Sequence, residues 1–176
     1  AWDANDPVLK AWEKIFPGQY HPISEISGDL MSHLRYPENL FKVQRELLAK
    51  YHVSSAGQFF SGEDFWQTPV DPTESATAQQ QGVPQPPYYL SLQTGGSKKP
   101  VFSLTSSYIP AGTSTREILT GFLSVDSDAG NEKGVIGPNY GTIRLQELPK
   151  DSNVPGPGQA QNNFNANADV SKELNL

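Results

Sequence analysis

Residues 35–53 show the clearest alternation of apolar and polar positions in the chain. Pro37 is preset for the first turn of a helix, where its missing N–H costs nothing. The side chains that share one helical face at this spacing are Leu40, Phe41, Gln44, Leu47, Leu48 and Tyr51. We therefore expect an amphipathic helix over residues 35–53, with this stripe forming the main cover of a sheet.

Capping residues and helix breakers predict three further helices in the N-terminal third of the chain. These helices are bounded by Asp6-Pro7 and Pro17-Gly18, by Ser27 and His33, and by Ser54 or Ser55 and Gly62. Residues 65–67 then form a brief extended segment. The pattern predicts a helical part over residues 1–66.

From residue 88 the apolar positions recur with a period of two, which is typical of strands. Turn residues separate four predicted strands, at 88–94, 101–109, 118–126 and 141–148. Gly95, Gly96 and Ser97 predict a hairpin between the first two strands. Residues 118–126 are apolar on both faces, as in an interior strand. Sequential strands with short links form an antiparallel meander, with the N-terminal helices packed on one face.

Two segments depart from both periods. Residues 71–87 are rich in Pro and Gln, which predicts a long solvated loop; a proline-rich recognition ligand is the alternative. Residues 151–176 form an amide-rich tail, in which 169–176 is the candidate for a final helix. The fold class is α+β, with one domain over 1–150, its β part at 88–148, and a C-terminal tail or docking segment after it.

Length, charge and composition exclude several classes of protein and of site. The chain of 176 residues is long enough for one domain with a core, and its net charge of −6 argues against a nucleic-acid partner. No apolar run reaches the ~20 residues that span a bilayer, so we expect no direct membrane span in these residues. Cysteine is missing, which excludes disulfides and thiolate sites. The start at Ala1 leads us to expect a processed product or a piece of a longer chain.

Several stretches together, in order, resemble the uncharacterised protein family 0182: residues 2–17, 33–52, 65–66, 88–90, 102–105, 122–128 and 154–164. The resemblance implies an internal soluble fragment of a bacterial multi-pass membrane protein, lying on the extracytoplasmic side of the cell membrane. The implied partner is the remainder of that membrane-spanning chain, with another protein or self-association as further expectations. The family has no established catalytic residues, so the resemblance implies no reaction.

The sequence carries no catalytic or metal-binding signature. Residues 126–132 hint at a calcium loop, but Gly130 and Gly137 stand where an EF-hand needs oxygen ligands, so we expect a hairpin loop. The remaining candidates also lack the spacing of a known site: His21, His33 and His52, and the serines at 103, 106 and 107. We expect no catalytic residue, no cofactor and no metal.

These observations leave three kinds of function open. We expect a non-catalytic interaction or structural module; the alternatives are a hydrolase of envelope polymers and a carbohydrate-binding module resting on Trp2, Trp12 and Trp66. The amides of the tail must find partners or stay hydrated, which predicts that the tail docks on the helical part or on a neighbour. The candidate interaction surface comprises Arg35, Tyr36, Gln159, Gln161, Asn162, Asn163 and Phe164.

Overall fold

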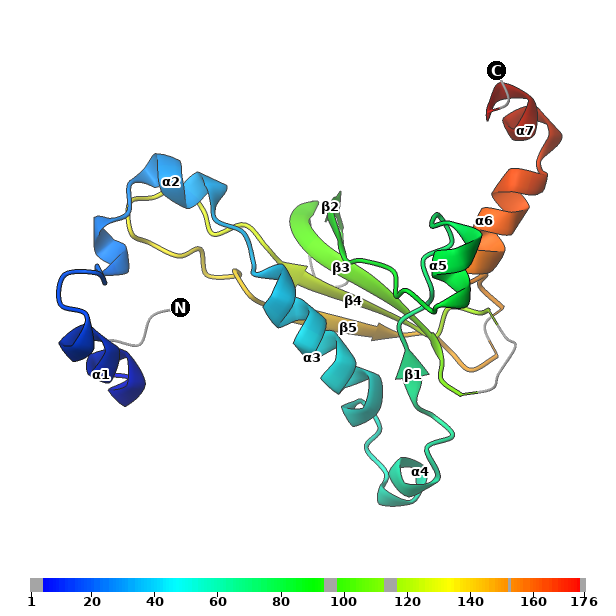
Figure 1. Ribbon diagram of the computed structural model, residues 1–176, viewed down its shortest axis with the longest axis horizontal. Helices are drawn as coiled ribbons and strands as arrows, with labels where there is room; N and C mark the ends of the chain where they lie inside the picture. Colours follow the sequence, from blue (N-terminus) through cyan, green and yellow to red (C-terminus); the bar gives the residue numbers. More distant parts are fainter. Residues whose placement is uncertain (1–4, 94–97, 113–116, 152, 175–176) are drawn as a thin grey trace.

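The structure is a computed structural model that describes residues 5–93, 98–112, 117–151 and 153–174. Its helices are α1 (Pro7–Ile15), the 3₁₀ helix η1 (Ile23–Glu25), α2 (Gly28–His33), α3 (Glu38–Tyr51), α4 (Ala56–Ser61), α5 (Ala76–Gln80), α6 (Pro157–Ala166) and α7 (Ala168–Leu174). Its strands are β1 (Trp66–Gln67), β2 (Tyr88–Leu92), β3 (Val101–Pro110), β4 (Gly121–Asp126) and β5 (Ile143–Glu147). The predicted α+β class is confirmed (Figure 1).

The strands form one open antiparallel sheet. β2, β3, β4 and β5 pair in sequence order, as the predicted meander requires, and β1 pairs with the far end of β3. The register places Leu104 opposite Val125, and Val125 opposite Ile143. β4 is an interior strand as predicted, but it begins at Gly121, because Ile118 instead makes an isolated bridge to Pro155. The hairpin predicted at residues 95–97 lies outside the described residues.

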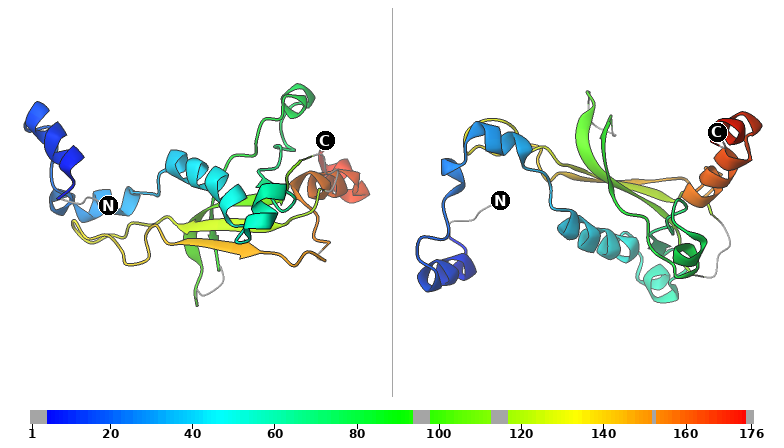
Figure 2. Two further views of the ribbon diagram at one scale, coloured as in Figure 1. Left: turned by 90° about the horizontal axis from the view of Figure 1, so that it is seen from below. Right: turned by 45° about the horizontal axis from the view of Figure 1, so that its top comes forward.

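Helix α3 lies along one face of this sheet (Figure 2). Side chains alternate across a strand, so every second residue of β3 faces the helix. Phe41 and Ala49 of α3 meet Leu104 and Tyr108 of β3 in the core, to which β4 adds Leu123. The prediction that this helix covers the sheet is confirmed.

The face that α3 buries differs from the predicted one. Leu40, Leu47 and Tyr51 were expected in the core, yet they are 47%, 52% and 67% exposed. The buried positions are Phe41, Arg45 and Ala49. At 100° per residue, this face is rotated by about a quarter turn from the predicted stripe.

Arg45 explains the rotation. Its Nη1 donates to the carbonyl oxygen of Gln85 at 2.9 Å and lies 3.3 Å from Oγ of Ser106. The hydroxyl of Tyr108 donates to the backbone oxygen of Arg45 at 2.8 Å. Burial lowers the pKa of the Arg45 guanidinium and raises the pKa of Tyr108. A residue that counts as polar in the sequence pattern therefore packs its stem in the core, with Nη1 of its head hydrogen-bonded and Nε lying 3.6 Å from Oε1 of Glu46.

The other helices extend beyond the sheet instead of covering it. α1 and α2 lie at one end of the molecule, and α6 and α7 lie at the other (Figure 1). Of the described helices in the N-terminal part, α3 is the one that packs on the sheet. The tail also differs: residues 157–166 form α6, because Pro157 occupies the first turn, where a proline fits.

The Pro- and Gln-rich segment 71–87 has more structure than a solvated loop. It contains α5, whose first turn is capped by the side chain of Ser75. Its ends are tied together, since the Asp71 N–H donates to Val83 O at 3.0 Å and the Gln85 N–H donates to Pro69 O at 2.8 Å. The Arg45 bond to Gln85 fixes this segment to α3.

The rotation of α3 predicts different costs for two substitutions on it. Phe41→Ala should lower the free energy of unfolding by about 3–5 kcal/mol, because Phe41 is 0% exposed. Leu47→Ala should change it by less than about 1 kcal/mol, because that side chain already meets water. Urea denaturation of residues 1–176 measures both, and equal losses would contradict the observed face.

Candidate functional site

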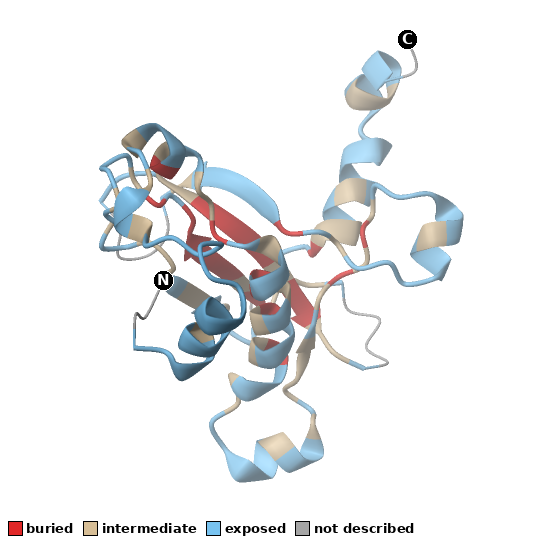
Figure 3. Cartoon of the chain, turned by 60° about the vertical axis from the view of Figure 1, so that its left-hand side comes forward, coloured by how far each residue is buried: buried red, intermediate tan, exposed pale blue. Residues whose placement is uncertain are grey.

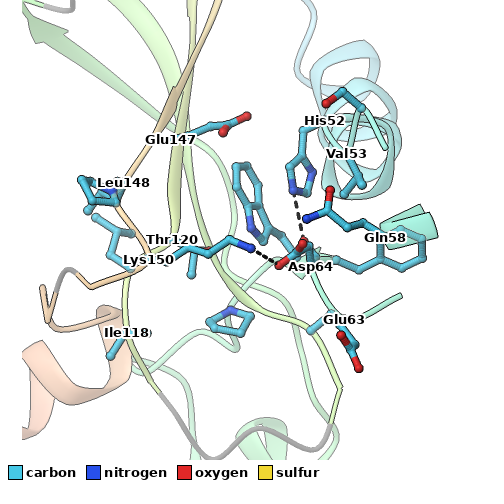
Figure 4. Close-up of a pocket in the computed structure, with 17 residues that line it drawn as sticks. His52, Val53, Gln58, Glu63, Asp64, Ile118, Thr120, Glu147, Leu148 and Lys150 are labelled. Atoms are coloured by element: carbon cyan, nitrogen blue, oxygen red, sulfur yellow. Dashed lines mark hydrogen bonds and ion pairs between the residues drawn. The ribbon is translucent and has the colours of Figure 1, made fainter. Parts of the chain in front are cut away.

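A cavity of about 520 Å³ lies at the end of the sheet where the C-terminus of α3 meets β1 and the end of β5 (Figure 4). The polar and aromatic side chains on its walls that could bind a ligand or take part in a reaction are His52, Glu63, Asp64, Trp66, Thr120, Glu147 and Lys150. They come from positions almost a hundred residues apart in the sequence, so no local motif marks this cavity.

His52 caps α3 and forms one wall of the cavity. Its Nδ1 lies 2.8 Å from the carbonyl oxygen of Leu48, and its Nε2 lies 3.1 Å from that of Asp64. A carbonyl oxygen only accepts hydrogen bonds, so each ring nitrogen faces an acceptor. A neutral imidazole donates only one of these two bonds, but both of its nitrogens are directed at backbone oxygens, which suits a structural wall better than a general base.

Trp66 is packed against neighbouring groups. The His52 ring stacks on it at a centroid distance of 3.5 Å, and the Tyr108 ring lies 5.3 Å away. A Cβ built on Gly121 would come within 2.7 Å of the indole, so this position requires glycine. With one face covered by His52, the indole supports the cavity wall and does not present an open platform for a sugar ring.

The charged groups at the cavity are partly paired. Nζ of Lys150 lies 2.6 Å from Oδ1 of Asp64, and this bond crosses the opening (Figure 4). The Lys150 side chain is 80% exposed, so the pair adds at most about 1 kcal/mol to stability. Within the described ranges, no three His, Cys, Asp or Glu side chains come close enough to hold a metal ion.

The segment that hints at a calcium loop uses its carboxylates internally. Both Asp126 oxygens accept from Arg144, and the Arg144 Nη2 bond measures 2.9 Å. Its hydrogen bonds to the Asp126 carboxylate raise the pKa of the Arg144 guanidinium. Asp128 accepts from the Gly130 N–H at 3.1 Å and lies 3.5 Å from Arg35. These partners make the carboxylates part of the fold.

Arg35 and Tyr36, the first two residues of the predicted interaction surface, hold the chain between α2 and α3. The Arg35 guanidinium lies 5.1 Å from the centroid of Phe102 and donates to Ser32 O at 2.7 Å. Tyr36 is 8% exposed and donates from its hydroxyl to Oε1 of Gln44 at 2.9 Å. Tyr36 is therefore a core residue, and Arg35 is half-buried beside it.

The remaining residues of that surface lie together on α6: Gln159, Gln161, Asn162, Asn163 and Phe164. Phe164 is 51% exposed, and Gln161 donates within the helix to Asn165 at 3.0 Å. α6 lies at the opposite end of the sheet from the segment that carries Arg35 (Figure 1). The structure does not bring the two groups into one surface, and their role in binding stays a prediction.

Two helices, α1 and α3, carry exposed apolar residues that the sequence pattern did not assign to a surface; Figure 3 colours exposed positions of the chain pale blue. On α1 and its C-cap these side chains are Val8 (62% exposed), Trp12 (47%), Ile15 (62%) and Phe16 (38%). On α3 they are Leu40, Val43, Leu47 and Tyr51. Contiguous apolar groups on a surface mark contact sites. The signal for α3 was present: its apolar positions cover more of the circumference than one sheet can bury.

Comparison with known proteins places the chain in a family. The uncharacterised protein family UPF0182 matches residues 1–176, and the chain belongs to it. A UPF0182 protein of Bifidobacterium adolescentis is 87% identical over 175 residues, which cover 99% of this chain and 16% of the relative. One of Tropheryma whipplei is 50% identical over 188 residues, covering 100% of this chain and 20% of the relative.

The chain thus spans about a sixth to a fifth of the length of these curated relatives. No solved structure matches it. Among the residues that the structure describes, none of the helices has the length and apolar character needed to cross a membrane.

Two glycine substitutions should have opposite effects on stability, because Gly121 lies against the Trp66 indole and Gly57 lies in an open part of a helix. Gly121→Ala should lower the free energy of unfolding by about 1–3 kcal/mol, because the new methyl group collides with the indole. Gly57→Ala should raise it by up to about 1 kcal/mol, because Gly57 lies within helix α4 and a Cβ there meets only Ser55 Oγ at 3.9 Å. Denaturation curves of the two variants check the signs; a neutral Gly121→Ala would contradict the close contact.

Proposed function

We propose that this chain is a non-catalytic interaction module of a larger bacterial membrane protein, and that its exposed helix faces pack on the remainder of that polypeptide. The observation that carries the proposal is the exposure of helix α1. This helix has a continuous apolar face, and none of its residues 7–15, all of them described, is buried.

A short helix with an exposed apolar face needs a packing partner to be stable. Helices shorter than about 12–15 residues are marginal in water and gain most of their stability from tertiary packing of an apolar face. α1 has 9 residues, and α6 and α7 have 10 and 7. None of the described residues of α6 or α7 is buried either. Because α1 lies at one end of the molecule and α6 and α7 lie at the other, the partner must supply packing at both ends.

The length of the relatives supports the choice of partner. More than three quarters of each of the two relatives lies outside the segment that matches this chain, so a large polypeptide surface accompanies it. Another protein or a second copy is the alternative partner, and the acidic net charge of −6 argues against nucleic acid. The proposed location is the extracytoplasmic side of the bacterial cell membrane, which rests on the family resemblance.

The alternatives of an envelope-polymer hydrolase and a carbohydrate-binding module fit the geometry less well. Both nitrogens of His52 face carbonyl oxygens, so His52 is not poised as a base at the cavity. Trp66 is stacked under His52. Trp12 stacks on Phe16 at 5.5 Å and belongs to the apolar face of α1. Trp2 lies outside the described residues.

Hydrogen exchange in a longer protein tests the proposal. In a chimera, residues 1–176 replace the matching segment of the Bifidobacterium adolescentis protein, which is 87% identical there. We expect the amides of residues 10–15 to exchange at least about tenfold more slowly than in an unfolded chain, because a covered helix opens rarely. Trp12→Ala should remove most of this protection, since it deletes the largest apolar group of the face.

Lys10→Ala is the matched control, because it changes the polar side of the same helix and should leave exchange unchanged. Exchange of residues 10–15 at the rate of an unfolded chain in the chimera would contradict the proposal. So would protection that Trp12→Ala and Lys10→Ala reduce equally.

A further inference from the structure

The outer face of α3 carries a row of apolar side chains that point away from the sheet. Leu40, Val43, Leu47 and Tyr51 follow one another at intervals of three and four residues, which places them on one side of the helix. They are 47%, 58%, 52% and 67% exposed. At 1.5 Å per residue the row runs for about 16 Å along the helix.

The row continues into a groove beyond the end of α3. A shallow cavity of about 310 Å³ lies between Tyr51, Val53, Ala56, Phe59 and Phe60. The Tyr51 and Phe59 rings lie 5.5 Å apart along it, and Phe60 is 89% exposed. The row and the groove together form one apolar surface across two helices, which we call the α3–α4 surface.

Polar groups border this surface on one side. Nζ of Lys42 lies 2.6 Å from Oε1 of Glu38, and the Glu46 side chain is 64% exposed. An apolar row with a charged border is the pattern on which an amphipathic helix docks, with side chains at three- and four-residue spacing set into the grooves between neighbours.

We propose that the α3–α4 surface is the docking site for an amphipathic helix from the part of the longer polypeptide outside these 176 residues. This inference rests on the proposed function and adds the position and the kind of element that binds. The same polypeptide is the occupant because it is tethered. A tethered segment meets its site at an effective concentration in the millimolar range, whereas a separate molecule loses translational and rotational freedom on binding.

Cysteine labelling in the chimera tests this inference. The 176 residues contain no cysteine, so single cysteines can be placed once those elsewhere in the chimera are changed to serine. Leu47→Cys reports on the α3–α4 surface, and Lys42→Cys is the control on the polar side of the same helix, where it removes only a surface ion pair with Glu38. Val8→Cys reports separately on α1, because it keeps Trp12 in the apolar face of that helix. A water-soluble maleimide is applied, and each rate is divided by its rate in urea.

We expect Leu47→Cys to react at least about tenfold more slowly than Lys42→Cys. If Leu47→Cys and Lys42→Cys react equally, whether fast or slow, the docking site is overturned. In that case slow labelling of Val8→Cys leaves the proposed function standing, whereas fast labelling at all three positions overturns both.

The occupant is identified by attaching benzophenone maleimide to Leu47→Cys, irradiating the chimera and sequencing the crosslinked peptides by mass spectrometry. Crosslinks within one molecule to a helical segment outside residues 1–176 are the expected result. Crosslinks to residues 1–176 of a second molecule, or to an unrelated protein, overturn the assignment of the occupant.

Discussion

The burial of Arg45 is the constraint on which the arrangement of the molecule depends. Its guanidinium is bound to Gln85 and Ser106, and the Tyr108 hydroxyl binds its backbone oxygen. These bonds connect α3, the segment before β2 and the centre of β3. Breaking a buried charged network is costly, because the partners left behind lose their hydrogen bonds without regaining water. The network therefore fixes the rotation of α3 on the sheet.

Because of that rotation, some apolar side chains of α3 pack in the core and the others lie on the surface. Phe41 and Ala49 enter the core, whereas Leu47 and Tyr51 face outward. A helix docked by its apolar stripe alone would have buried Leu47 and left Arg45 in water. The outward face is thus a direct consequence of placing a charged residue in the core, and it links the packing of the domain to its proposed role as an interaction module.

Local chemistry made much of the fold predictable. The Asp6 cap, the proline at the start of α1 and the alternation around Leu104 each depend on neighbours a few residues away. Arg45 could not be predicted, because its partners lie 40 and 61 residues distant. The helix that begins at Pro157 was not predicted, since proline serves both turns and first helical turns. The cavity beside His52 has no local signal, because it forms only when distant segments meet.

The most direct test of the account is an experimental structure of the longer polypeptide by cryo-electron microscopy. The account predicts a helix from outside residues 1–176 packed beside α3, with its axis about 8–10 Å away on the Leu47 side, and Arg45 still buried against Gln85. A map in which the Leu47 side of α3 faces solvent, or in which α3 is turned so that Leu47 packs on the sheet, would contradict it.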